Sequence, residues 1–191
     1  MFTEQNIPGL YLINNIIIND KIVEKLDQMN WCHITSNPKS RLVQHYGYIY
    51  DYQTGKNNLK CEDIPDFLFE YRDILKKYCV DNGLVDQSYD FNQCIVNNYL
   101  VGQGISPHID SKSFGKVIGS FTVSGSSIMT FKNLNESKEI YVKPNSLYVM
   151  SGDSRYIWTH EMKGKNFDII EDNKIMRTRR ISITFRNVPT L

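Results

Sequence analysis

Residues 91–131 read FNQCIVNNYLVGQGISPHIDSKSFGKVIGSFTVSGSSIMTF, and this stretch decides the fold class. Its short apolar runs are separated by turns rich in Gly, Ser and Asn, a pattern typical of antiparallel strands joined by tight connections. The pattern continues almost to the C-terminus and predicts a β-sandwich. The polar segment 161–179 is expected to be a long loop. The expected strands are 94–100, 116–123, 127–131, 139–142, 146–150, 156–160 and 180–186.

Upstream of this stretch the pattern becomes helical. An apolar run over 11–18 predicts a short strand, and Asn19 is the expected N-cap of a helix of about ten residues. A second helix is expected from Pro65 to about Asp81, because apolar side chains recur there with the helical period. The side chains expected on its apolar stripe are Phe67, Tyr71, Ile74 and Tyr78.

Helices followed by many strands predict an α+β fold. The expected architecture is a double-stranded β-helix, a cupin-like jelly roll, with the N-terminal helices packed on one face. Such a fold places its ligands inside the mouth of the roll. A chain of 191 residues is long enough for one well-buried core, so a single domain is expected over 1–191. Within it, 1–90 would hold the helices and a lid, and 91–188 the β-helix core.

Composition is that of an ordinary globular protein, with 41% hydrophobic and 23% charged residues. The net charge of +1 indicates neither a strongly basic nor a strongly acidic surface. Locally, Lys174, Arg177, Arg179 and Arg180 form a basic cluster that is either a solvated loop or a contact for a phosphate backbone. The four cysteines show no C-x-x-C spacing and are expected to be reduced.

The N-terminus lacks the basic start and apolar run of a signal peptide, and no apolar stretch reaches the roughly 18 residues of a membrane span. The protein is therefore expected to be an intracellular monomer, cytoplasmic or nuclear, that is not secreted and has no membrane partner.

Two residues of the opening stretch, His108 and Asp110, are candidate metal ligands. Residues i and i+2 of an extended chain project to the same face, and His160 follows 52 positions later (160 minus 108). Two imidazole nitrogens and one carboxylate on one side of a divalent ion, with the other positions open, suit the non-heme Fe(II) oxygenases. Alone, a His-x-Asp pattern is a weak signal.

The segment Arg180-Ile-Ser-Ile-Thr-Phe-Arg186 strengthens the metal hypothesis. Its alternation predicts a strand with Arg180 and Arg186 on the same side. A guanidinium binds a carboxylate through two parallel hydrogen bonds, which a lysine cannot do. Beside a metal triad this pair indicates a dicarboxylic acid ligand, whereas by itself it would indicate a solvated strand edge.

Three other functions remain open from the residues alone. A zinc hydrolase could use the same His-Asp-His set, but it has no need of the arginine pair. A non-catalytic binding module on the same fold is a second possibility. The third is an oxygenase that acts on protein instead of nucleic acid.

Three motifs carry a resemblance to a known family, and the resemblance as a whole covers roughly residues 41–188. They are Asn97-Asn-Tyr99-Leu-Val-Gly-Gln-Gly-Ile-Ser-Pro-His108-Ile-Asp110, Met150-Ser-Gly-Asp-Ser-Arg155-Tyr-Ile-Trp-Thr-His160, and Arg180 to Arg186. The chain resembles an AlkB-type Fe(II)- and 2-oxoglutarate-dependent dioxygenase, and it looks most like the homologues that hydroxylate a modified wobble uridine of tRNA. An alkylated-base demethylase of the same family, acting on DNA or RNA, is the alternative.

The resemblance implies Fe(II), the cosubstrate 2-oxoglutarate and O₂ as cofactors, with iron held by the predicted triad. It also implies that Arg180 pairs with the distal carboxylate of 2-oxoglutarate and that Arg186 lies near its metal-bound end. Asn97 and Tyr99 would donate hydrogen bonds to the same cosubstrate. Asp153 and Arg155 are expected to form only a local ion pair.

The segment 41–52 carries tyrosines at 46, 48, 50 and 52. This alternation predicts a half-buried strand, and it also resembles the nucleotide-recognition lid of AlkB proteins. Enzymes that modify a base take it out of its stack and hold it between flat side chains. Arg41, Tyr46 and Tyr48 are therefore candidate substrate contacts.

One position departs from the alkylation-repair members of the family. They carry a second acidic residue two positions after the metal-binding Asp, where this chain has Lys112. A cation there would repel a positively charged methylated base, because like charges are unfavourable in a poorly solvated pocket. The sequence therefore favours a neutral or acidic modified uridine, with Lys112 among the substrate-binding residues.

Overall fold

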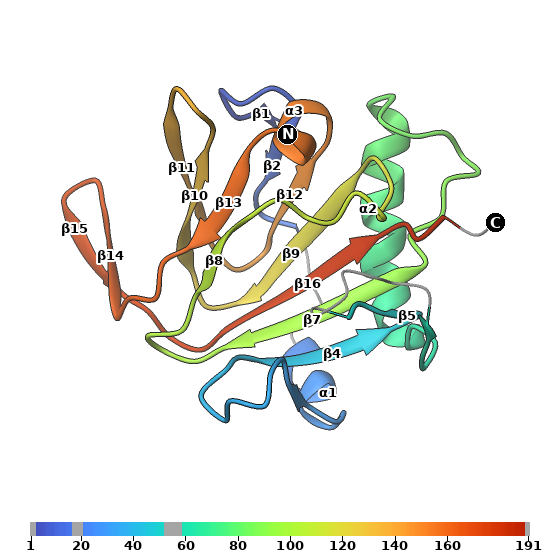
Figure 1. Cartoon of the computed structure of the whole chain (residues 1–191), viewed down its shortest axis with the longest axis horizontal. Helices are drawn as coiled ribbons and strands as arrows, with labels where there is room; N and C mark the ends of the chain where they lie inside the picture. The colour runs from blue at the N-terminus through green and yellow to red at the C-terminus, as the bar shows by residue number, and fades with distance from the viewer. Residues whose placement is uncertain (1–2, 17–20, 52–58, 190–191) are drawn as a thin grey trace.

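In a computed structural model of the chain, residues 3–16, 21–51 and 59–189 are described, and two facing antiparallel sheets dominate them (Figure 1). The larger sheet has the order β1-β2-β12-β9-β16-β7-β4-β3. The strands of this sheet are β1 Thr3–Glu4, β2 Leu10–Ile13, β12 Ser146–Met150, β9 Ile118–Ser124, β16 Arg180–Arg186, β7 Gln93–Tyr99, β4 Leu42–Tyr46 and β3 Cys32–His33. The smaller sheet consists of β11 Ser137–Val142, β10 Ser127–Lys132, β13 Thr159–Met162 and β8 Ile105–His108, in that order.

Short elements complete the described part of the chain. Hairpins join β5 Tyr48–Ile49 to β6 Leu59–Lys60 and β14 Phe167–Ile170 to β15 Asn173–Met176. The helices are α1 Ile22–Asp27, α2 Phe69–Asp81, which follows a 3₁₀ turn at Asp66–Leu68, and α3 Gly152–Tyr156. This arrangement confirms the predicted double-stranded β-helix with helices on one face. No helix in the described ranges has the length and apolar character needed to cross a membrane.

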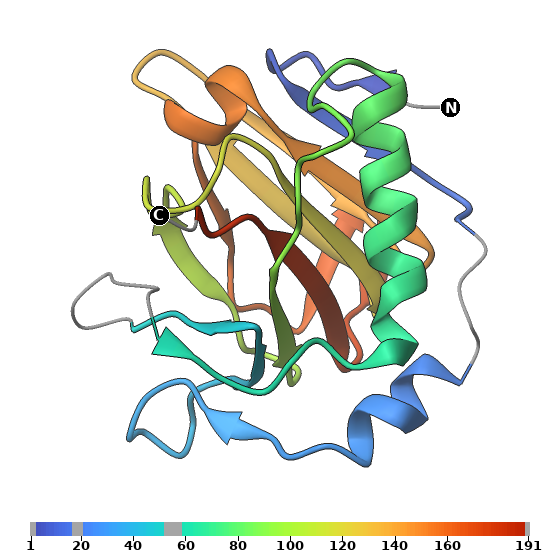
Figure 2. The same cartoon turned by 90° about the vertical axis from the view of Figure 1, so that its right-hand side faces the viewer.

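Helix α2 runs along the outer face of the larger sheet (Figure 2). Tyr71 meets the ring of Phe121 edge-on, with the ring centroids 5.4 Å apart. Leu75 packs so closely on Gly119 that a Cβ there would lie 2.3 Å from its methyl carbon. The helix is where the sequence predicts it, but its buried stripe follows Tyr71, Leu75 and Cys79. The other predicted stripe residues are only partly buried at the margin of this core.

Strand β16 explains how one sheet serves two purposes. Ile181, Ile183 and Phe185 are fully buried in the core shared with α2. The alternate side chains, from Arg180 to Arg186, point into the space between the two sheets, because successive residues of a strand face opposite ways. One face of the strand therefore contributes to stability and the other builds a polar cavity.

The N-terminal segment follows the sequence predictions in part: β2 overlaps the strand expected over 11–18, and β4 falls within the strand expected over 41–52. Besides helices, residues before 90 supply both edges of the larger sheet: β2 pairs with β12, and β4 pairs with β7. Helix α1 has six residues, with Lys21 at its N-cap position, and is shorter than predicted. The expected cap, Asn19, lies outside the described residues.

Two predictions after 150 were wrong. The strand expected over 156–160 begins only at Thr159, as β13, because Tyr156 ends the helix α3, whose N-terminus is closed by a reciprocal capping box of Ser151 and Ser154. The segment 161–179 is not a loop, since it contains the end of β13 and the whole β14–β15 hairpin.

Candidate metal centre

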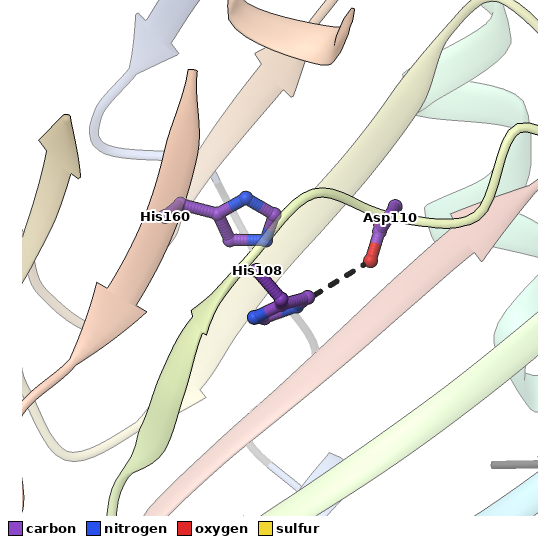
Figure 3. Close-up of side chains that lie close together, drawn as sticks. All are labelled: His108, Asp110 and His160. Carbon is purple, nitrogen blue, oxygen red and sulfur yellow. Dashed lines mark ion pairs between the residues drawn. The ribbon is translucent and has the colours of Figure 1, made fainter. Parts of the chain in front are cut away.

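His108, Asp110 and His160 come together between the two sheets (Figure 3). The backbones of His108 and His160 are paired across β8 and β13, and the ring centroids lie 4.3 Å apart. Asp110 follows in the loop after β8, with Oδ1 3.5 Å from Nε2 of His108. One ligand atom from each residue lies within 4.8 Å of the others. The spacing predicted from the sequence is therefore realised as a cluster.

The protonation states of this cluster suit a cation. Nδ1 of His108 lies 2.8 Å from the carbonyl of Ser106, which can only accept, so Nδ1 carries a proton and Nε2 is the nitrogen left to face a metal ion. Burial lowers the pKa of His160 to about 4, which keeps its ring neutral. One nitrogen of each imidazole and one carboxylate oxygen therefore lie close enough together to share a single ion. This donor set fits Fe(II).

Asp110 stays ionised although it is buried. Burial by itself raises the pKa of its carboxyl, but Arg186 and the two histidines outweigh that effect and hold the pKa well below its usual range. Arg186 Nε donates to Asp110 Oδ2 at 3.2 Å. One carboxylate oxygen is therefore anchored by Arg186, and the other faces the histidines.

An inner cavity behind the triad is lined by a buried arginine side chain. Arg180 is only 5% exposed, donates from Nη2 to Thr122 Oγ1 at 3.0 Å and lies over the ring of Tyr99. Its Nε has no hydrogen-bond partner among the described residues. A buried guanidinium with an unused donor is costly unless an anion completes it, so the cavity fits a carboxylate. Asn97 and Tyr99 line the same cavity, as predicted.

A larger outer cavity of about 410 Å³ opens beside the triad. Asn97, His108, Asp110 and Arg186 belong to both cavities, so a molecule in the outer one would lie against the metal centre. The residues that only the outer cavity contributes include Arg41, Tyr50, Ile95, Ile109 and Phe114. Arg41 Nε donates to Asn97 Oδ1 at 3.0 Å.

The predicted lid is placed only in part. Tyr46 is 2% exposed and belongs to the core, where its hydroxyl donates to Gln44 Oε1, so it cannot contact a substrate. Gly47, with a φ of +76°, breaks the strand, and the alternation therefore does not continue. Tyr48 lies on β5 and does not line either cavity, whereas Tyr50 does. Tyr52 lies outside the described residues.

Lys112 and most of the predicted basic cluster lie away from the two cavities. Lys112 is exposed and is not among the residues that line them. The predicted cluster near 174–180 is not a phosphate-binding surface, because three of its members point elsewhere: Arg177 forms a buried ion pair with Asp168, Arg179 pairs with Asp27, and Arg180 lies in the inner cavity.

Sequence reasoning missed one residue at this centre. Arg155 forms no ion pair within the described ranges, with Asp153 or any other residue, and donates instead to backbone carbonyls of the loop that carries Asp110. The only sequence signal is a lone arginine five positions before His160, which no general pattern singles out.

Comparisons with known proteins agree with this geometry. Residues 18–186 match the family described as the 2OG-Fe(II) oxygenase superfamily. The chain is 34% identical over 195 aligned residues to the uncharacterised protein L905 of Acanthamoeba polyphaga mimivirus, covering 96% of this chain and 87% of that protein. It is 33% identical to the Xenopus tropicalis tRNA (carboxymethyluridine(34)-5-O)-methyltransferase alkbh8, covering 95% of this chain but only 32% of that longer protein. The solved structure of OsALKBH1 has the same fold, with a TM-score of 0.68 and 13% identity over 94% of this chain and 97% of that one.

Proposed function

Because the chain belongs to the 2OG-Fe(II) oxygenase superfamily, as an AlkB-type member, we propose that it hydroxylates the side chain of a modified wobble uridine in tRNA. The enzyme uses Fe(II), 2-oxoglutarate and O₂. Together, these supply the oxidising power that inserts an oxygen atom into a C–H bond. A zinc hydrolase or a non-catalytic module, the alternatives left by the residues alone, does not match this family.

In this proposal the triad residues and the predicted cosubstrate-binding residues each have a defined task. His108, Asp110 and His160 would hold the iron, a ligand set that suits an Fe(II) centre with open positions. Arg180 binds the far carboxylate of 2-oxoglutarate with its unused donors. Asn97 and Tyr99 line the inner cavity that Arg180 shares with the triad. These residues bind and orient, and the chemistry belongs to the cofactors.

Arg186 has a different task from Arg180. Its Nε is engaged with Asp110, and its guanidinium lies over the ring of Phe114, 4.9 Å from the ring centroid. It therefore fixes the orientation of the ligand carboxylate and adds positive charge beside the metal-bound end of the cosubstrate.

The observation that best supports a uridine substrate is the character of the outer cavity together with the identity of the tRNA-modifying relative. Arg41 and Arg186 bring positive charge to this cavity, and among the described residues that line it Asp110 is the only carboxylate. A cationic methylated base would meet like charge there, while a neutral or acidic uridine would not. Tyr50 and Phe114, with ring centroids 5.3 Å apart, offer flat faces for a base.

The deciding experiment is mass spectrometry of nucleosides after incubation of the protein with Fe(II), 2-oxoglutarate and either tRNA or methylated DNA oligomers. The expected result is a gain of one oxygen on a modified uridine, with succinate formed in equal amount. Loss of methyl groups from alkylated bases, with tRNA unchanged, would instead identify a demethylase. Succinate formation with a protein substrate alone would overturn the nucleic-acid assignment.

Arg41 is expected to set the preference for uncharged or acidic bases. Changing Arg41→Gln keeps a donor for Asn97 but removes the positive charge from the cavity. The rate on 1-methyladenine relative to modified uridine should then rise about tenfold, which corresponds to roughly 1.4 kcal/mol. Competition assays with both substrates in one reaction measure this ratio.

Lys112→Gln is the matched control, since it removes the exposed cation that the sequence first suggested. It should leave the ratio unchanged. If Lys112→Gln shifts the preference and Arg41→Gln does not, the charge that matters is on the loop after Asp110 and not in the cavity wall.

A further inference from the structure

Arg155 is the largest of the side chains that are almost completely buried, at 1% exposure, and the proposed chemistry does not use it. Burying a guanidinium is costly, and ion pairing with a carboxylate usually offsets the cost. Within the described part of the chain, Arg155 has no such ion pair. Its hydrogen bonds go to backbone carbonyls instead, and all of those carbonyls belong to one short loop.

The acceptors lie on residues 110–115. Arg155 Nη1 donates to the carbonyl of Asp110 at 2.7 Å, and Nη2 donates to those of Ser111 at 2.6 Å and Phe114 at 3.3 Å. Nε completes the set with the carbonyl of Gly115 at 3.4 Å. The N–H donors of a guanidinium lie in one plane at fixed directions. Four carbonyls that accept from the same guanidinium are therefore restricted in their positions relative to one another.

This loop needs such support because it has no sheet pairing of its own. Strand β8 ends at His108, and no helix or strand follows until β9 begins at Ile118. The backbone hydrogen bonds around the loop are few: Phe114 N–H donates to Ser111, and Gly115 N–H donates to Asn187. The carboxylate of Asp110 nevertheless has to face two histidines on the smaller sheet.

Arg155 also lies close in sequence to another ligand. It belongs to α3, which leads directly into β13, where His160 faces the cluster. Its hydrogen bonds therefore connect the segment that leads to His160 with the loop that holds Asp110. His108 is already connected to His160 by the pairing of β8 and β13.

We propose that Arg155 is a positioning residue of the metal centre, which holds the Asp110 loop in its metal-binding form by collecting the loop carbonyls. The inference rests on the proposed metal site. Arg155 acts through the backbone of the Asp110 loop and itself touches neither metal nor substrate. The same loop carries Phe114, so the wall of the outer cavity depends on it as well.

The test is the affinity of the protein for Co(II), used as a spectroscopic substitute for Fe(II) and followed by its visible absorption. Arg155→Met fills the space without donors and should weaken Co(II) binding by about 10- to 100-fold, the range seen when groups supporting a metal ligand are removed. It should also alter the absorption spectrum, because Asp110 is no longer held in place. Arg155→Lys keeps the charge and some donors and should give an intermediate affinity, and it decides the matter if Arg155→Met does not fold.

Ser154→Ala is the matched control on the same helix. Ser154 is equally buried, and its hydroxyl closes the capping box with Ser151, so the variant destabilises α3 without touching the loop. It should lower the melting temperature and leave Co(II) affinity and spectrum unchanged. All variants are measured well below their melting temperatures.

The outcomes separate this inference from the metal site itself. If the wild-type protein binds Co(II) and folded Arg155 variants bind it equally well, or if Ser154→Ala weakens binding as much as Arg155→Met, Arg155 has only a general structural role. If the wild-type protein itself fails to bind Co(II), the metal site is wrong, and the positioning role falls with it.

Discussion

Replacing Asp110 with Asn is expected to abolish turnover with every substrate and to lower metal affinity by at least about 100-fold, more than the loss of a supporting group would. The amide keeps an acceptor for Arg186, so the shape of the site and the fold survive. The negative charge that holds a divalent cation beside two neutral imidazoles is lost, and the amide oxygen is a much weaker ligand. Titration calorimetry with Mn(II) measures the affinity, and succinate formation measures turnover.

Asp168→Asn supplies the control, because Asp168 is a buried aspartate that pairs with an arginine, Arg177, outside the metal cluster. Weakening that pair should lower the free energy of unfolding by about 3 kcal/mol and leave Mn(II) affinity unchanged. Undiminished metal binding in Asp110→Asn would remove Asp110 from the ligand set. Equal loss of binding in both variants would show that general destabilisation explains the effect.

The features that the sequence predicts correctly depend on covalent geometry alone. The alternation of β16 follows from the two-residue period of a strand, so Arg180 and Arg186 had to share a face. The two-residue separation of His108 and Asp110 likewise favours one side of the chain. Convergence with His160 depends on which strands pair, so spacing alone gave it only a weak signal, which the arginine pair and then the family resemblance strengthened.

The missed elements lack the usual sequence signals. Glu171 and Asp172 form the two-residue turn between β14 and β15, each with positive φ, at 48° and 63°. Turns of this kind normally carry Asn-Gly, so the hairpin was taken for a loop. The small helix α3 uses serine at both ends of its capping box, where glutamate or glutamine would have been the signal.

Tertiary contacts account for the other differences at the site. Gly47 interrupts the strand after Tyr46, and one residue in the left-handed region is enough to move the tyrosines from a shared face to different environments. Arg155 could not be recognised because its partners are carbonyls, which every residue has. Because a buried arginine of this kind has no Asp or Glu partner, the sequence contains no pair of opposite charges that would point to it.

Replacing Arg180 with Ala is expected to raise the KM for 2-oxoglutarate by about 100-fold, or roughly 2.7 kcal/mol, which is in the range for truncating one partner of a buried charge pair. Arg180 is almost fully buried, and its Nε has no partner among the described residues, so a carboxylate held there would have little water to replace the lost hydrogen bonds. Because iron binding does not depend on this residue, metal affinity should stay unchanged. Succinate formation measured against 2-oxoglutarate concentration gives the KM.

Arg180→Lys separates charge from geometry, since a lysine keeps the charge but cannot form two parallel bonds; its KM should rise about tenfold. Arg179→Ala is the adjacent control, because Arg179 points to the opposite side and pairs with Asp27 at the surface. Its KM should equal that of the unmodified protein. A normal KM in Arg180→Ala would mean that the diacid is anchored elsewhere, whereas a loss confined to the two Arg180 variants would assign the buried guanidinium to the cosubstrate.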